Sequence, residues 1–508
     1  MTRPGEPIGL GPRRQLFFDD ALVEERAGLR RVVRAPRKRG AVLKAEKPWE
    51  GLYISTFSAP MWVESEGVFK QVYECRDAEE RGNEGHRYAV AVSADGIAWE
   101  RPELGLVDYG GSRANNLFPT PDGRRLVHVV HDPDDPDGGR RYKGLLTVPE
   151  GRVPVVSADG LHWRKLDALL PSGDAGTLGF DRGKRLFMAM LKRPNPATVG
   201  RSYDISLSGD FVSWSEPRLV FGMDRGRDQA MALETVRRRL ADNALAKPLF
   251  VDPDPGAGWD FAGGGEPTPT WRAECYNFGV VPYEGIYLGL ATVYFPTGQR
   301  LPERRNADGF NQVQLVASRD LKDWARPGGR QPFLETSPLT DGLAGNYDRL
   351  QLGAYNGLTL HGDEARLYYT GMKRRVPQHE RWTDGTPRPP ETLSAAERAD
   401  WLEDTHSALC LATVPRDRFV ALEAGADGGH LLTRPLRLDG DRLRFNLDAG
   451  GGEARVEAYD AESGAALGET TLRGDGTDTA AGLDLPRAGR LRLKITLRRA
   501  ALYALWAD

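Results

Sequence analysis

The chain has 508 residues, and its 69 Lys and Arg against 72 Asp and Glu give a net charge of −3. This near balance argues against a dedicated nucleic-acid-binding protein, and no apolar run reaches the ~18–20 residues of a membrane-spanning helix. The 59 glycines and 35 prolines favour a chain with many turns, and therefore an all-β fold, over one built from long helices.

The first residues lack the apolar segment of roughly 7–15 residues that marks a signal peptide. The three cysteines, Cys75, Cys275 and Cys410, are far apart and in no metal-ligand spacing. We therefore expect a cytoplasmic protein with reduced core thiols and without a cofactor or a metal. The oligomeric state is left open, with a homo-oligomer among the alternatives.

One pattern, Ser-x-Asp-x-x-x-Trp, occurs four times, each time after a short alternating apolar run. In such a turn the Asp accepts backbone N–H groups, and the Trp begins the next strand and packs over the hairpin. We call the unit the Asp–Trp turn. The copies run from Ser93 to Trp99, Ser157 to Trp163, Ser208 to Trp214 and Ser318 to Trp324, and a degenerate fifth has Asp417 and Phe419.

Five units predict a five-bladed β-propeller. Successive copies are 64, 51, 110 and 95 residues apart, whereas a four-stranded blade needs only ~40–50 residues, so the long intervals contain insertions. One insertion includes a predicted helix over 229–240. The N-terminal segment 15–20 is expected to supply the strand that closes the ring.

After about residue 425 the pattern changes to alternating strands joined by acidic glycine turns, without an Asp–Trp turn. We interpret residues 1–424 as the propeller and 425–508 as a separate β-sandwich. The predicted fold is therefore all-β, a five-bladed propeller followed by a C-terminal β-sandwich.

Strand direction alternates within a blade, so the starts of the first strands and the loops between second and third strands share one face. We expect the loops 75–87, 131–141, 192–201, 295–311 and 372–407 there, opposite the Asp–Trp turns. Long loops on a rigid ring commonly carry a binding site.

The residues at or near the first-strand starts include four acids and one amide. They are Glu50, Asp174, Glu274, Asp348 and Asn116. Paired carboxylates are what hydrolysis of a glycosidic bond requires, because one protonates the leaving oxygen while another attacks or activates water. A single acid at a strand start more often caps a turn or is solvated, so only their grouping suggests catalysis.

Other residues near the same face suggest substrate binding. Aromatic and amide side chains can stack on a sugar or bond its hydroxyls, and cations can bind a substrate carboxylate or phosphate. The alternative for the cations is solvated charge balanced by nearby acids. The candidates are Trp49, Tyr276, Asn277, Asn116, Arg349, His86, Arg201 and His406.

Several segments resemble the invertase-, levanase- and arabinanase-like glycoside hydrolases, most closely the family-32-like proteins of undefined substrate. They are Phe17-Phe-Asp-Asp20, Pro48-Trp-Glu50, Glu274-Cys-Tyr-Asn277, Pro282-Tyr-Glu-Gly285 and Tyr347-Asp348. The resemblance implies a propeller with a β-sandwich and a general-acid role for Glu274. It does not supply a nucleophile, because the first strand, Tyr53 to Pro60, contains no acid.

The leading hypothesis is a glycoside hydrolase for a small glycoside or oligosaccharide, with furanosides among the candidates. Glu274 and Asp348 are the expected acid and base, with Asp174 and Glu50 in support. The alternatives are a non-catalytic carbohydrate-binding propeller and a sialidase-like enzyme for an acidic sugar. The expected partner is a small carbohydrate, with neither a nucleic acid nor a membrane.

Overall fold

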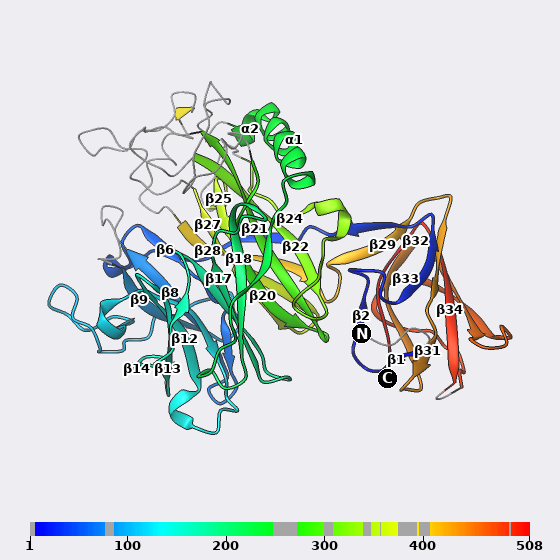
Figure 1. The fold of residues 1–508 in the computed structure, drawn as a ribbon, viewed down its shortest axis with the longest axis horizontal. Helices are drawn as coiled ribbons and strands as arrows, with labels where there is room; N and C mark the ends of the chain where they lie inside the picture. The colour runs from blue at the N-terminus through cyan, green and yellow to red at the C-terminus, as the bar shows by residue number, and fades with distance from the viewer. Residues whose placement is uncertain are drawn as a thin grey trace.

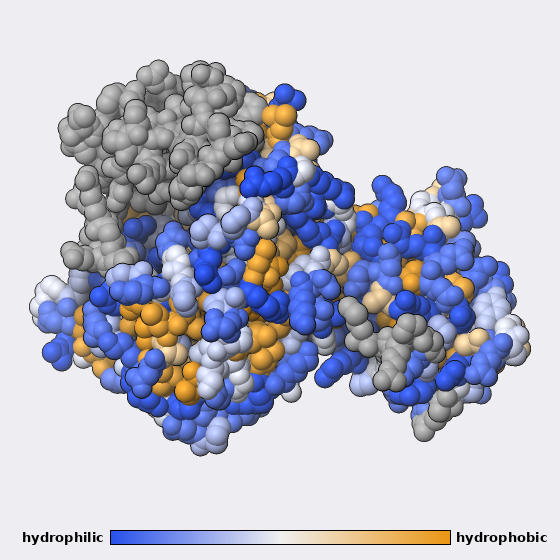
Figure 2. Space-filling view, in the orientation of Figure 1, coloured by the Kyte–Doolittle hydropathy of each residue, from blue (hydrophilic) through white to orange (hydrophobic). Residues whose placement is uncertain are grey.

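The computed structural model describes residues 6–76, 86–246, 272–298, 308–338, 347–355, 357–373, 394–395, 407–486 and 489–508. The described chain forms two lobes built mainly of β-strands (Figure 1). The larger lobe contains five separate sheets, and the smaller lobe contains one 11-stranded sheet. The visible surface of both lobes is largely hydrophilic, and its more extensive apolar patches lie on the larger lobe (Figure 2).

Each sheet of the larger lobe is one antiparallel blade. Blade I contains β6 (Tyr53–Ser55), β7 (Met61–Val63), β8 (Val68–Arg76), β9 (Arg87–Ser93) and β10 (Leu117–Phe118). Blade II contains β11 (Leu126–His131), β12 (Tyr142–Val148), β13 (Gly151–Ser157), β14 (Trp163–Lys165) and β15 (Leu170–Pro171). Blade III contains β16 (Gly176–Asp181), β17 (Leu186–Lys192), β18 (Val199–Ser208) and β19 (Arg218–Met223).

The last two blades follow the same plan. Blade IV contains β20 (Glu274–Tyr283), β21 (Ile286–Gly298), β22 (Asp308–Ser318), β23 (Trp324–Ala325) and β24 (Pro332–Leu334). Blade V contains β25 (Gln351–Gly353), β26 (Leu358–His361), β27 (Glu364–Met372), β28 (Ser407–Pro415) and β5 (Arg37–Lys44).

Five apolar clusters join the blades into a ring. Each cluster takes side chains from two neighbouring blades. One of them joins blade V to blade I and so completes the ring. The burial of apolar surface between successive sheets is what holds such a ring together. Members from facing blades include Val72 and Leu146, Leu145 and Phe187, Met190 and Phe278, Leu290 and Tyr369, and Leu411 and Tyr73. The predicted five-bladed propeller is confirmed.

The four Asp–Trp turns have one geometry. In each, an Asp oxygen accepts two backbone N–H groups at 2.8–2.9 Å, as Asp95 does from Ile97 and Ala98. Every turn follows the third strand of its blade. The fifth copy differs, because the buried Asp417 instead accepts a 2.7 Å hydrogen bond from the Tyr283 hydroxyl and pairs with Arg14.

The strand that closes the ring is β5, which pairs antiparallel with β28 from Arg37–Thr413 to Lys44–Ala408. The expectation that segment 15–20 closes the ring was wrong. Within that segment, β2 (Gln15–Leu16) pairs with the C-terminal strand β35 (Ala500–Ala507). A strand so close to the N-terminus can join either lobe, and only long-range pairing decides which.

The smaller lobe takes strands from both ends of the chain. Its N-terminal members are β1 (Ile8–Leu10), β2, β3 (Val23–Ala27) and β4 (Arg30–Val33). Its C-terminal members are β29 (Val420–Ala424), β30 (Gly429–Thr433), β31 (Leu436–Leu438), β32 (Leu443–Asp460), β33 (Ala466–Ala480), β34 (Arg490–Arg498) and β35. Strand pairing therefore does not follow the expected division at 424/425. The description of this lobe as a sandwich stays a prediction.

Two described helices lie in the insertion between blades III and IV, α1 (Arg227–Ala241) and the short α2 (Asn243–Ala246). The helix expected over 229–240 is confirmed, and Ala232 and Val236 pack into the core between blades III and IV. Single 3₁₀ turns occur at η1 (Pro48–Glu50), η2 (Pro121–Gly123), η3 (Gly138–Arg140) and η4 (Pro327–Arg330). No helix in the described ranges has the length and apolarity to cross a membrane.

Candidate functional site

The first strands of all five blades begin at one end of the ring, which we call the mouth. Four of the five loops expected there join a second strand to a third, and the described ends of those strands lie at this end. The loop 131–141 does not, because it joins β11 to β12 and its Arg140 guanidinium donates to the carbonyl of Asp210 in an Asp–Trp turn at 2.6 Å. In blade II the second and third strands are joined by a tight hairpin instead.

Asp174 is the exposed carboxylate of the predicted set. It lies two residues before β16, its side chain is 81% exposed, and it accepts a 3.1 Å hydrogen bond from Lys192. Partial desolvation by itself would raise the pKa of Asp174, but Lys192 and, at longer range, Arg201 and Arg125 outweigh it and hold the pKa below its usual value. Asp174 is therefore ionised at neutral pH, as a base or nucleophile must be.

Tyr276 shares Lys192 with this carboxylate and presents a half-buried ring to cations from blade III. The ammonium of Lys192 lies 4.6 Å from the ring centroid, and the guanidinium of Arg201 lies 5.3 Å from it. The backbone carbonyl of Tyr276 and the buried Asn277 side chain both accept from the Tyr203 hydroxyl, at 2.9 and 3.1 Å. Asn277 is thus tied to the blade interface, whereas the ring of Tyr276 belongs to the mouth.

Glu274 is fully buried, and both of its carboxylate oxygens accept from arginines. Arg272 donates at 2.5 Å to one oxygen and Arg201 at 2.9 Å to the other. Gly200, with φ +61°, allows this approach, because a Cβ there would lie 2.5 Å from the carboxylate. These contacts match the structural alternative to catalysis, in which a carboxylate that holds two guanidinium groups positions them rather than delivering a proton.

Glu50 and its neighbours form a buried network of blade I. The carboxylate of Glu50 accepts from Arg101 at 2.6 Å, from the Tyr73 hydroxyl at 2.5 Å and from two backbone N–H groups of its own loop. The indole N–H of Trp49 donates to the fully buried Asn116 at 2.7 Å. These polar groups satisfy one another, so the network fixes the loop before β6.

Asp348 is also buried and does not contact Glu274. Its carboxylate pairs with Lys38 of β5 at 2.6 Å and accepts from the Tyr369 hydroxyl at 2.9 Å. The contacts tie the start of the first strand of blade V to the strand that closes the ring. Arg349 is buried beside it, with its carbonyl accepting from Arg239 of α1 at 3.2 Å. His406 lies outside the described residues.

The mouth contains an ion-pair group that sequence reasoning did not find. Glu74 near the end of β8 accepts from Arg125 at 2.6 Å and pairs with His86 at 2.8 Å. Burial alone would raise the pKa of Glu74, but Arg125 and His86 hold it well below its usual value. His86 was a predicted binding residue, while Glu74 lies inside an ordinary strand pattern and Arg125 directly precedes β11, so neither gives a local signal.

Aromatic rings from three blades meet at the centre of the ring. Phe57 lies 4.6 Å from Tyr355 and 5.6 Å from His128, measured between ring centroids. His128 is buried and has φ +58° at a bulge in β11, a conformation that non-glycine residues adopt mainly at constrained, often functional, positions. Arg125 lies 4.6 Å above the Phe57 ring, so this cluster lies beneath the charged groups of the mouth.

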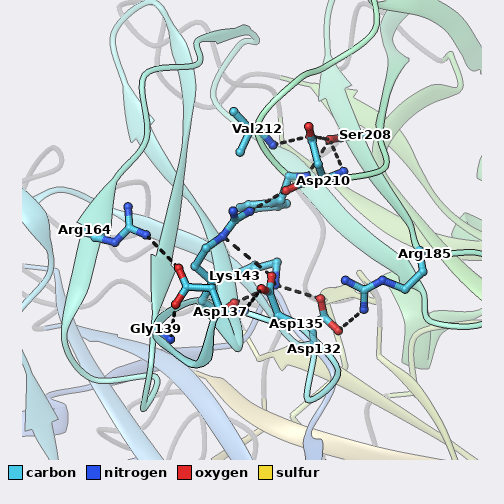
Figure 3. Close-up of polar contacts among 12 residues, drawn as sticks. Asp132, Asp135, Asp137, Gly139, Lys143, Arg164, Arg185, Ser208, Asp210 and Val212 are labelled. Carbon is cyan, nitrogen blue, oxygen red and sulfur yellow. Dashed lines mark hydrogen bonds and ion pairs between the residues drawn. The ribbon is translucent and has the colours of Figure 1, made fainter.

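The opposite end of the ring has two features of its own. A cavity of about 240 Å³ is lined mainly by apolar residues of the first strands of blades I to IV. Nearby, the buried Lys143 donates to Asp132 at 3.0 Å and to Asp135 at 2.8 Å, and Arg185 binds the other oxygen of Asp132 at 2.6 Å (Figure 3). This network joins blades II and III and leaves no buried charge of its members uncompensated.

A metal site is not visible in the described part of the chain, where no three His, Cys, Asp or Glu side chains gather as ligands would. The three cysteines are buried and unpaired. Burial raises the pKa of the Cys75, Cys275 and Cys410 thiols, so they are not reactive nucleophiles.

No protein-family model matches the chain, and no curated protein matches its sequence. Solved structures resemble it at low identity. An N-acetylgalactosamine deacetylase from F. plautii is 14% identical over 77% of this chain and 97% of its own, with a TM-score of 0.39. An exo-beta-1,3-galactanase from Phanerochaete chrysosporium is 9% identical over 92% and 99%, with a TM-score of 0.35.

A glycoside hydrolase family 43 arabinoxylan arabinofuranohydrolase from Bacillus subtilis is 9% identical over 92% of this chain and 98% of its own, with a TM-score of 0.33. Similarity of this size indicates neither the activity nor the substrate of this chain. The resemblance to family 32 in particular stays a prediction.

Proposed function

We propose that the protein is a glycoside hydrolase that binds a small glycoside at the mouth of the propeller. The observation that carries the proposal is Asp174, an exposed and ionised carboxylate that accepts a hydrogen bond from Lys192, whose ammonium also lies over the ring of Tyr276. An aromatic face can stack on a sugar ring, and an ionised carboxylate can attack the anomeric carbon or activate water. We assign Asp174 this nucleophilic or basic role.

Hydrolysis needs a second carboxylate as the general acid, and we assign this role to Glu274. Its two arginines argue for the alternative that it positions Arg201 against the substrate. The two roles give different kinetics, because protonation of the leaving group matters little for a substrate whose leaving group is already good. A positioning residue instead affects binding whatever the leaving group is.

The test is a screen of nitrophenyl and alkyl glycosides, furanosides and pyranosides, followed by two variants. For a substrate that is turned over, Asp174→Asn should lower kcat by about 10²–10⁴-fold. Glu274→Gln should lower kcat on alkyl glycosides and much less on nitrophenyl glycosides if it is the acid. An equal rise in KM for both classes would assign it to positioning, and unchanged turnover in Asp174→Asn would refute the proposal.

A non-catalytic carbohydrate-binding propeller is the second candidate. It is favoured by the burial and full pairing of Glu50, Glu274 and Asp348, which leave Asp174 as the exposed acid of the predicted set. Sugar binding that depends on Tyr276, without hydrolysis of any glycoside in the screen, would establish this function instead.

A further inference from the structure

Arg152 is a buried arginine without an acidic partner. It lies at the start of β13, on the mouth side of blade II, and is 0% exposed. One N–H donates to the carbonyl of Gly151 at 2.8 Å, while Nε and Nη2 have no hydrogen-bond partner. No ion pair joins it to any carboxylate in the described part of the chain. Buried charges in proteins are normally paired, so this one calls for an explanation.

The two unpartnered groups have a specific geometry. Nε–H and Nη2–H point from the same edge of the planar guanidinium, and together they form the fork that binds both oxygens of a carboxylate. The third nitrogen, Nη1, is the one fixed by Gly151. The guanidinium is thus held in place by the backbone, and its carboxylate-binding edge is left without a hydrogen-bond partner within the described ranges.

The surroundings of this edge belong to the mouth. The charged groups that interact with Arg152 are Arg125 and Asp174. Beside Nε lies Gly176, where a Cβ would be 3.6 Å from that nitrogen and 3.8 Å from the Ser172 hydroxyl. Burial lowers the pKa of Arg152 to about 10, which still leaves it charged at neutral pH. The edge therefore presents a full positive charge close to Gly176 and Ser172, next to the exposed Gly173 and Asp174.

The partly exposed cations of the mouth add to the same field. Arg125 and Arg201 have side chains that are 21% and 19% exposed, and each is bound to a buried glutamate. Unlike Arg125 and Arg201, Arg152 is not bound to a carboxylate among the described residues. An incoming anion would supply the missing charge.

We propose that Arg152 anchors a subsite for a sugar carboxylate, so that the ligand of the mouth is a glycoside of a uronic acid. The proposal rests on the proposed function, because it assigns the substrate class of the same mouth. The sugar carboxylate binds the Nε and Nη2 edge, with Arg125 beside it. Since the guanidinium is fully covered, binding requires a local shift of Ser172 and the exposed Gly173, while Asp174 keeps its contact with Lys192.

The test is titration calorimetry on the full chain. The probes are the methyl glycosides of glucuronic and galacturonic acid, their neutral counterparts methyl glucoside and methyl galactoside, and sodium sulfate alone. We expect at least one uronide to bind ten times or more tightly than its neutral counterpart. Arg152→Met should weaken that uronide by about 10- to 100-fold and leave the neutral sugar unchanged.

Two further variants make the result specific. Arg152→Lys keeps the charge but lacks the fork, so it should still lose at least tenfold, and it provides the measurement if Arg152→Met does not fold. Arg164→Met makes the same change in the same blade, at an exposed arginine near the opposite end (Figure 3), and should bind as the unmodified chain does.

Equal affinity for uronides and neutral sugars, or no uronide binding, would overturn the inference. Sulfate that binds as tightly as the uronides through Arg152 would also overturn it, since the site would then not be specific for a carboxylate. Arg152-dependent uronide binding without hydrolysis would uphold the inference and refute the hydrolase. Hydrolysis of neutral and acidic glycosides at equal rates would uphold the hydrolase and refute the uronic-acid subsite.

Discussion

Lys143 and Arg152 lie on neighbouring strands of blade II, and both are completely buried, yet their surroundings are opposite. Lys143, near the end with the Asp–Trp turns, contacts two carboxylates and a backbone carbonyl. Arg152, at the mouth, contacts one carbonyl. The comparison suggests that where a buried charge serves the fold it is fully compensated, and that an uncompensated one marks a place that receives a ligand.

The same contrast extends to the carboxylates. Glu50, Glu74, Glu274 and Asp348 are buried and bound to cations, whereas Asp174 is exposed. The acids around the mouth are therefore members of ion pairs, and Asp174 is the accessible one among those named. Transferring a charge out of water without a partner is costly, so strand-start acids that become buried must acquire cations.

The largest expected effect on stability is at Lys143, the buried cation whose charge is fully paired. Lys143→Met leaves Asp132 and Asp135 without their shared ammonium, and we expect a loss of about 3–5 kcal/mol in the free energy of unfolding. Urea unfolding of the full chain, followed by tryptophan fluorescence, measures it. Lys165→Met, which removes an exposed lysine of the same blade, should leave stability unchanged. A small effect of Lys143→Met would end the contrast with Arg152.

His128 gives a pH-dependent test of burial at the centre of the ring. Burial and, secondarily, the Arg152 charge lower the pKa of His128 from 6.5 to about 3. The folded protein thus keeps His128 neutral, while the unfolded chain takes up a proton below pH 6.5. The stability that neutral His128 contributes is present above pH 6.5 and is lost as the pH falls toward 3.

Between pH 7 and pH 5 this linkage should lower the free energy of unfolding by about 2 kcal/mol, and His128→Phe should remove that part of the pH dependence. His162→Phe, at an exposed histidine of the same blade, is the control and should keep the slope. An identical slope in His128→Phe and the unmodified chain would show that His128 is not the group responsible.

The smallest effect is expected at Arg152. Replacing an uncompensated buried charge by an apolar side chain of similar length removes an unfavourable desolvation, so Arg152→Met should change the free energy of unfolding by less than about 1 kcal/mol in either direction. The same urea unfolding measures it. A loss comparable to that of Lys143→Met would mean that Arg152 has a structural partner and that the comparison fails.

Local sequence determined the repeating part of this protein. The Ser, Asp and Trp of each turn interact within seven residues, so four copies were sufficient to predict the blades and the positions of Trp99, Trp163, Trp214 and Trp324. The helix over 227–241 was likewise predictable from its own composition. These features depend on short-range hydrogen bonds and periodicity, which the order of residues specifies directly.

Long-range pairing decided the rest. Segments 8–33 join the C-terminal sheet, and β5 closes the ring, because strands near the N-terminus find partners more than 360 residues away. For the same reason the sequence marked Glu274 and Asp348 as acids but could not show the cations that bind them. Nor could it single out Arg152, since whether a charge is compensated depends on which distant side chains the completed ring brings to it.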